Sequence, residues 1–77
     1  KWKLISQPVP GALVLSPTGM SNKNYRHGHI GILCLGNAIA SNDSRSGLFV
    51  ENYTWNSWNQ VFRDKMGFPV FIFEKIA

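Results

Sequence analysis

Short apolar segments separated by proline and glycine constrain the fold of this chain more than any other feature of its sequence. Residues 12–16 are an apolar run bounded by Pro10 and Pro17. Proline fixes its own φ and disfavours helix in the residue before it, so a run this short predicts a buried strand. Residues 29–35 alternate with a period of two and predict a second strand.

One amphipathic segment predicts a helix. Thr54 is a suitable side-chain cap for a helix over residues 55–66. Gly67 suits the position just after a helix, and Pro69 prevents continuation. Three large aromatic residues follow the cap at the spacing i, i+3 and i+7, which places them on one face: Trp55, Trp58 and Phe62.

Turn and loop residues separate the remaining predicted strands. Gly36 and Asn37 both tolerate positive φ and predict a tight hairpin turn. Residues 17–28 have the composition of an exposed loop. The expected fold class is α+β and mostly β, a small antiparallel sheet or partial barrel of four or five strands with one short helix. The expected strands cover residues 12–16, 29–35, 38–41, 48–51 and 69–74.

Length and cysteine content exclude several classes of protein. Seventy-seven residues allow one small domain, and a hydrophobic content of 44% excludes a disordered tail. Cys34 is the single cysteine, so an internal disulfide and a cysteine-rich zinc site are both excluded. No apolar run approaches the ~18 residues of a membrane span. The chain begins with Lys1 rather than methionine and has no signal-peptide pattern, so we expect a piece of a longer protein.

His29 is the leading candidate for a catalytic residue. It lies where a loop becomes a strand, and we expect Gly28 and Gly31 to leave open space beside it. Such a position suits a general base, although a strand-end histidine can also merely hydrogen-bond a loop carbonyl. We expect His27 to be solvated. His27, His29 and Asp43 form too weak a pattern for a metal site, so neither a metal nor another cofactor is expected.

Cys34 does not qualify as a nucleophile for His29. It lies five residues along the same predicted strand, about 16 Å away at ~3.3 Å per residue, and on the opposite face. We therefore expect it to be a small core residue. Residues 41–44 return along the hairpin towards His29, so one of them is expected to fix its tautomer. The alternative is a turn in which these residues bond their own backbone.

Three further residues are candidates for contact with a ligand. Trp55 is either part of the core or a groove residue that stacks on a sugar or peptide. Arg26 lies on a flanking loop, where it either faces an anionic ligand or is solvated, and Asp43 is the third candidate. The net charge of +4 comes from scattered basic residues and favours an acidic partner such as a cell-wall polymer, nucleic acid or anionic lipid.

An ordered set of motifs within residues 8–51 resembles the C-terminal half of the NlpC/P60 and CHAP cysteine peptidases. In that superfamily an apolar strand after Pro-Gly leads to a Gly-His-Val-Gly-Ile strand that carries the catalytic histidine, followed by a short hairpin with a third polar residue. The resemblance implies that His29 is the base and that Asn42, with Asp43 in reserve, orients it. Counting residues strictly across the hairpin would place the orienting residue at Ala40, whose side chain cannot orient a histidine. Ala12 occupies the position where the family commonly has aspartate. The matching motifs in this chain are Pro10-Gly11 with residues 12–15, then 28–32, 36–37 and 39–41.

The resemblance implies the C-terminal part of a cell-wall cysteine peptidase or amidase of papain-like fold that hydrolyses amide bonds of peptidoglycan stem peptides. The family nucleophile, a cysteine at a helix N-terminus, precedes the first of these motifs, so we expect it in an N-terminal part of the same protein. Residues 1–77 are then a single domain or the C-terminal subdomain of a larger peptidase domain. A bacterial or phage origin and a secreted, periplasmic or extracellular location follow from the same resemblance.

A competing interpretation is a non-catalytic, SH3-like module that binds the cell wall through aromatic residues. Nucleic-acid binding by an OB-like barrel is less consistent with the sequence, because residues 71–73 lack basic residues interleaved with the aromatic ones. Several sheet edges would lose their partners if half of a domain were missing. Exposed edges favour pairing with a second copy, so a homodimer is a further expectation.

Overall fold

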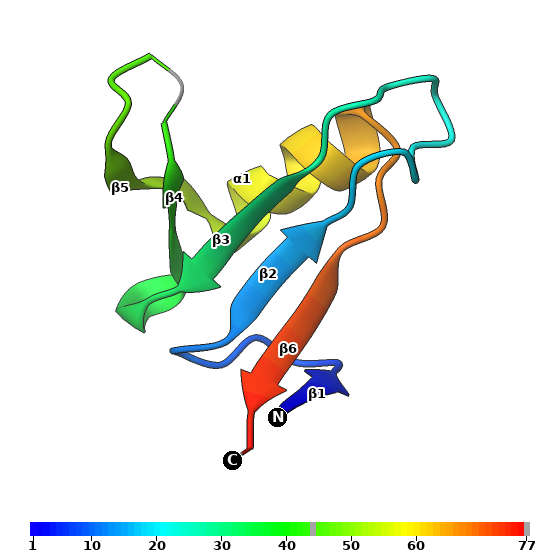
Figure 1. Cartoon of the computed structure of the whole chain (residues 1–77). Helices are drawn as coiled ribbons and strands as arrows, with labels where there is room; N and C mark the ends of the chain where they lie inside the picture. The colour runs from blue at the N-terminus through cyan, green and yellow to red at the C-terminus, as the bar shows by residue number, and fades with distance from the viewer. Residues whose placement is uncertain (44, 77) are drawn as a thin grey trace.

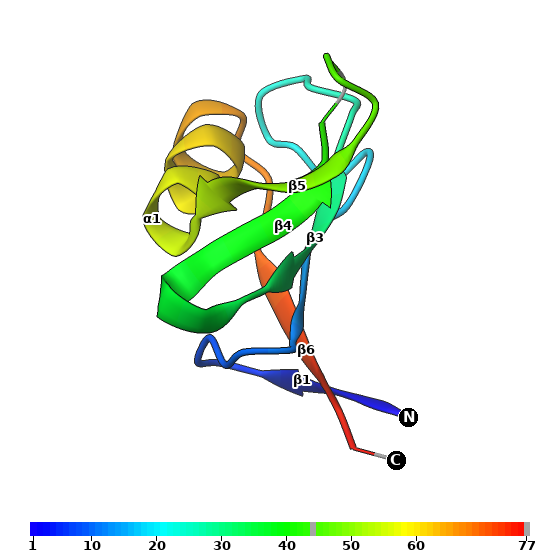
Figure 2. The same cartoon turned by 90° about the vertical axis from the view of Figure 1, so that its left-hand side faces the viewer.

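The strands of this chain form one antiparallel sheet. The computed structural model describes residues 1–43 and 45–76. Over those residues the sheet has six strands in the order β1-β6-β2-β3-β4-β5, and one short helix lies on one side of it (Figures 1 and 2). The strands are β1 (Trp2–Ile5), β2 (Leu13–Ser16), β3 (His29–Leu33), β4 (Ala38–Asn42), β5 (Phe49–Thr54) and β6 (Phe71–Lys75).

The predicted mostly-β antiparallel architecture is confirmed, and the predicted number of strands is too low. The additional strand is β1, which pairs with β6 so that Trp2 lies opposite Lys75 and Ile5 opposite Ile72. The two ends of the described chain therefore lie side by side (Figures 1 and 2). Among the described strands β1 and β5 are the two outer ones, so the sheet is open.

The hairpin between β3 and β4 turns where the sequence predicts it. Gly36 and Asn37 both have positive φ, 71° and 62°. The turn includes a short 3₁₀ segment, η1 (Leu35–Asn37), and is closed by a hydrogen bond of 2.7 Å from the Cys34 N–H to the Ala38 carbonyl. The return strand β4 therefore starts directly after the turn.

The helix begins and ends near the predicted residues but changes its winding. Helix α1 (Trp55–Trp58) starts with a capping box, in which Thr54 and Ser57 each bond the other's backbone N–H. It continues as a π-helical segment, η2 (Asn59–Lys65), whose end is marked by a 3.0 Å bond from the Met66 N–H to the Val61 carbonyl. Among the described residues no helix is long and apolar enough to cross a membrane.

The core lies between the helix and the inner face of the sheet. Trp58 and Phe62, from α1 and η2, are buried there, as their predicted spacing on one face requires. They pack with inward-facing residues of several strands, among them Val14, Leu33 and Ile39. The opposite face of the sheet is exposed: Ile30 and Ile32 of β3 are 51% and 38% accessible.

Cys34 does not belong to this core, so that prediction was wrong. The thiol is half-buried and lies 3.6 Å from the Ile32 carbonyl oxygen. The period of two places Cys34 on the same side of the chain as Ile30 and Ile32, and this side is the uncovered one. The alternation was read correctly, but sequence did not indicate which face the helix covers.

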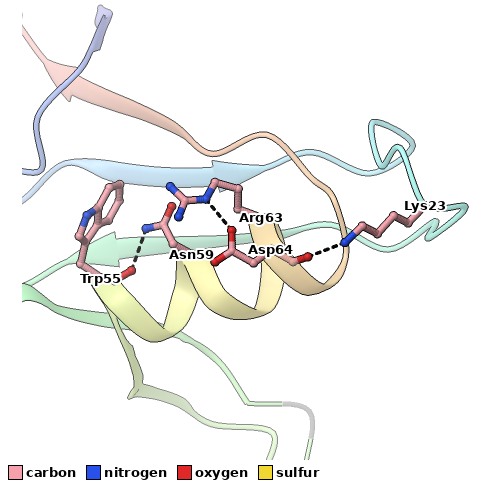
Figure 3. Close-up of polar contacts among 5 residues, drawn as sticks. All are labelled: Lys23, Trp55, Asn59, Arg63 and Asp64. Carbon is pink, nitrogen blue, oxygen red and sulfur yellow. Dashed lines mark hydrogen bonds and ion pairs between the residues drawn. The ribbon is translucent and has the colours of Figure 1, made fainter.

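The loop over residues 17–28 is tied to the C-terminal end of the helix. The Ser21 hydroxyl donates to the Met66 carbonyl, and the Asn22 N–H donates to the Gly67 carbonyl at 3.1 Å. The Lys23 ammonium donates to the Asp64 carbonyl at 2.6 Å (Figure 3). The Asp64 and Met66 carbonyls belong to the last turn and the C-cap of the helix, where carbonyls lack partners within the helix, so these bonds link the loop to the helix end.

Candidate functional site

The imidazole of His29 lies among three aromatic rings. His29 is the first residue of β3, and its ring is stacked on Phe62 with a centroid distance of 5.6 Å and an interplanar angle of 19°. Trp58 stacks at 5.5 Å and 27°, and Tyr53 meets the imidazole edge-on at 6.3 Å. Aromatic contacts at these distances restrict the orientation of the histidine ring.

A buried hydrogen bond fixes the position of Trp58. The indole Nε1–H donates to the Ser16 hydroxyl at 3.1 Å, and both residues are 0% exposed. Ser16 lies directly opposite His29 in the pairing of β2 with β3. The same strand pair therefore positions His29 and the residue that anchors the aromatic ring beside it.

The electrostatic surroundings of His29 favour a neutral imidazole. Partial burial lowers the pKa of His29, and a hydrogen bond to the main chain of Asn42 offsets part of that effect. The main-chain group that raises a histidine pKa is the carbonyl, which accepts from a ring N–H. In the neutral form the second ring nitrogen then carries a lone pair and can accept a proton.

The glycines that flank His29 allow close packing instead of the open space that we expected. A Cβ on Gly28 would lie 2.0 Å from the Ser16 carbonyl oxygen and 2.5 Å from the carbonyl carbon of Pro17. A Cβ on Gly31 would lie 2.6 Å from Cγ2 of Ile39, and the Trp58 ring would also be too close. Both glycines are therefore required because neighbouring atoms occupy the position of a side chain.

His29 borders a pocket of about 260 Å³. The pocket lies where the start of β3, the β4–β5 hairpin and the C-terminal part of the helix meet. Of the predicted site residues, it brings together His29, Asn42 and Asp43. The other residues that line it are His27, Gly28, Asn52, Tyr53, Phe62 and Met66.

Two predicted ligand-binding residues lie elsewhere. Trp55 packs against the core and lines a separate hollow on the helix with Asn59 and Arg63 (Figure 3). All residues that line this hollow belong to α1 and η2, so it is a feature of the helix surface. Within it, Asn59 donates from its side chain to the Trp55 carbonyl at 2.8 Å. Arg26 is exposed on the loop over 17–28 and is not among the residues that line the His29 pocket.

Asp43 forms part of a turn, which was the alternative interpretation of residues 41–44. Its carboxylate accepts from the Ser46 hydroxyl at 2.9 Å and from the Arg45 N–H at 3.3 Å. The Ser46 hydroxyl, followed by the Arg45 N–H, lowers the pKa of Asp43. Ser44 lies outside the described residues. The contact that restrains His29 comes instead from the main chain of Asn42.

A β-bulge adds Asn52 and Tyr53 to the pocket. The pairing of β4 with β5 shifts between Ile39 and Ala40: Ile39 lies opposite Tyr53, whereas Ala40 lies opposite Glu51. Asn52 is therefore the extra residue of β5, and bulges re-aim side chains in this way. Asn52 was not predicted as a site residue, because the register of two strands is required to locate a bulge.

The described part of the chain brings no thiol to the pocket. Cys34 lies at the other end of β3 from His29 and on its exposed side. Within residues 1–43 and 45–76 there is also no group of three or more histidine, cysteine, aspartate or glutamate side chains arranged to hold a metal ion. The polar side chains that line the pocket are those of His27, His29, Asn42, Asp43, Asn52 and Tyr53.

Comparisons with known proteins assign no family to this chain. No family model, curated protein or solved structure matches it. The resemblance of residues 8–51 to NlpC/P60 and CHAP peptidases therefore stays a prediction. A function for the site has to be argued from its own residues.

Proposed function

We propose that this chain supplies the general base of a cysteine peptidase or amidase of the NlpC/P60 type, acting on amide bonds of peptidoglycan stem peptides. The observation that carries the proposal is the His29 imidazole: its ring is stacked on Trp58 and Phe62, partial burial lowers its pKa, and it borders a pocket. The cysteine nucleophile comes from polypeptide other than these 77 residues.

The proposed role of His29 is proton transfer at a thiol. The free ring nitrogen of neutral His29 takes the proton of the cysteine, and the thiolate attacks the carbonyl carbon of the amide. The imidazolium then gives this proton to the nitrogen of the departing amine, and water hydrolyses the thioester that remains. The main chain of Asn42 raises the pKa of His29, so the Asn42 side chain is not needed for that effect.

The proposed partners follow from this assignment. They are peptidoglycan peptides and the N-terminal part of the same protein, which meets the pocket at His29. The net charge of +4 suits an anionic cell wall, and the proposed location is secreted, periplasmic or extracellular. The outer strands β1 and β5 leave sheet edges at which a second copy can pair.

The first experiment is a native mass spectrum of the protein from its source, followed by a denaturing one. A second, cysteine-containing polypeptide that separates on denaturation, or a longer chain that contains the cysteine, identifies the complete enzyme. In that enzyme His29→Ala is expected to lower muropeptide cleavage by about 10²–10⁴-fold, the usual contribution of a general base.

Two matched variants make this test specific. Asn56→Ala changes an exposed residue of α1 that does not line the pocket, and it is expected to keep activity within about threefold of wild type. Asn42→Ala keeps the main-chain carbonyl and is also expected to remain active. Cleavage by His29→Ala within about tenfold of wild type contradicts the proposed role of the base.

A second candidate function is non-catalytic binding of the cell wall. The position of Cys34, away from the pocket, favours it, since the described residues then need no chemistry. In this case Tyr53→Ala, which removes a ring that lines the pocket, abolishes capture on peptidoglycan, whereas His29→Ala leaves it intact. Trp55→Ala tests the separate helix surface in the same assay.

A further inference from the structure

A buried hydroxyl holds the side chain of Asn52 beside His29. Ser41 of β4 is 0% exposed, and its hydroxyl donates to Oδ1 of Asn52 at 2.6 Å. A hydroxyl has one proton to donate, and a buried hydroxyl without an acceptor is costly. Because the Ser41 hydroxyl needs a hydrogen-bond acceptor, Oδ1 of the Asn52 carboxamide is turned towards Ser41.

This bond leaves the other end of the carboxamide available to a ligand. With Oδ1 turned to Ser41, the Nδ2 group offers two N–H donors, and it makes no hydrogen bond to any residue in the described parts of the chain. Asn52 lines the same pocket as His29 and Tyr53. The pocket thus combines a proton acceptor with an oriented, uncharged donor.

The other lining residues indicate the kind of oxygen that this donor receives. Tyr53, Phe62 and Met66 give the pocket apolar surface, and its described lining includes no lysine or arginine. A phosphate group would lack a cationic partner there and would meet the negative charge of Asp43 at the rim. A peptide carbonyl carries no net charge, so it suits one neutral amide donor better, whereas a terminal carboxylate would meet the same charge of Asp43.

We propose that Asn52 is a substrate-binding residue whose carboxamide N–H donates to a carbonyl-type oxygen of a peptide in the His29 pocket, and that Ser41 is the positioning residue for it. The choice of a peptide as ligand rests on the proposed function, whereas the donor itself follows from the Ser41–Asn52 bond and the β-bulge.

The test uses the side-chain amide signals of Asn52, which are visible in a ¹⁵N–¹H correlation spectrum of the chain. N-acetyl-alanine amide offers carbonyl oxygens alone, and N-acetyl-alanine adds a carboxylate. Binding of either probe is expected to move the Asn52 Nδ2 signals in a saturable manner. Stronger binding of N-acetyl-alanine identifies a terminal carboxylate as the preferred oxygen, and equal binding identifies a backbone carbonyl.

Variants separate a direct contact from an indirect one. Asn52→Ala is expected to weaken binding about three- to tenfold, the effect of losing one neutral hydrogen bond. Asn56→Ala, which changes an exposed asparagine on α1, is expected to bind as wild type. Ser41→Ala frees the carboxamide, so it should bring the two Nδ2 proton shifts closer together and weaken binding about threefold without a loss of far-UV circular dichroism.

The outcomes distinguish this inference from the proposed function. Unmoved Asn52 signals, an Asn52→Ala variant that binds as wild type, or no binding of either probe overturns the inference. In the complete enzyme, Asn52→Ala is expected to raise KM about three- to tenfold with kcat nearly unchanged, whereas His29→Ala lowers kcat. Probe binding through Asn52 together with full cleavage by His29→Ala overturns the proposed function and leaves the binding role of Asn52 standing.

Discussion

The hydrogen bond between Trp58 and Ser16 makes a quantitative prediction, since it anchors the ring on which His29 stacks. Both residues are 0% exposed, so water cannot replace a lost partner. Ser16→Ala leaves the indole N–H buried without an acceptor, which costs about 1–3 kcal/mol. A domain of this size is stabilised by only about 4–12 kcal/mol in total. A loss of about 2 kcal/mol lowers Tm by about 8–16 °C.

The assay is urea unfolding followed by far-UV circular dichroism, in a double-mutant cycle with Trp58→Phe. Phenylalanine removes the donor, so Ser16→Ala in that background should cost less than about 0.5 kcal/mol, because both partners are then apolar. Ser6→Ala, at an exposed serine, is the control and should stay within about 0.5 kcal/mol of wild type. A Ser16→Ala chain as stable as this control refutes the reasoning.

Two further predictions concern the surroundings of His29. Gly31→Ala places a Cβ against Ile39 and Trp58 and should cost about 1–3 kcal/mol in the same unfolding assay, with a displaced imidazole signal; wild-type stability contradicts the tight packing. Burial lowers the pKa of His29, so the folded state favours the neutral imidazole. The stabilising contribution of neutral His29 is full above about pH 6.5, and it is lost as the pH falls towards the lower pKa of the folded state. His29→Gln should flatten this pH dependence.

Local signals in the sequence predict those parts of the fold that neighbouring residues determine. The turn at Gly36 and Asn37, the capped helix and the strand that begins at His29 all depend on residues close together in the chain. Strand β1 was missed because its partner β6 lies about 70 residues further along, and Trp2 and Leu4 in it are exposed. An exposed outer strand has no buried face, so its sequence does not show the alternation of apolar and polar residues that marks other strands.

The candidate site was predictable in its centre and not in its surroundings. His29, Asn42 and Asp43 line one pocket because the hairpin turns at the predicted residues, and its return strand β4 therefore ends beside the start of β3. Trp55 was predicted either as a core residue or as a groove residue, and it packs against the core while lining a hollow on the helix away from His29. Asn52 enters through a bulge, and the restraint on His29 comes from a main-chain carbonyl, a group that every residue possesses and that no sequence pattern marks.

Gly28 and Gly31 show why the expectation of open space beside His29 was wrong. A glycine in a sequence has two opposite explanations, space kept open for a ligand and space already filled by a neighbour. At Gly28 the end of β2 fills it, and at Gly31 the packing of Ile39 and Trp58 fills it. The space left open beside His29 therefore lies in the pocket that Asn52 and Tyr53 help to line and in a second hollow between the end of β2 and Ile30, and neither depends on the missing side chains of the glycines.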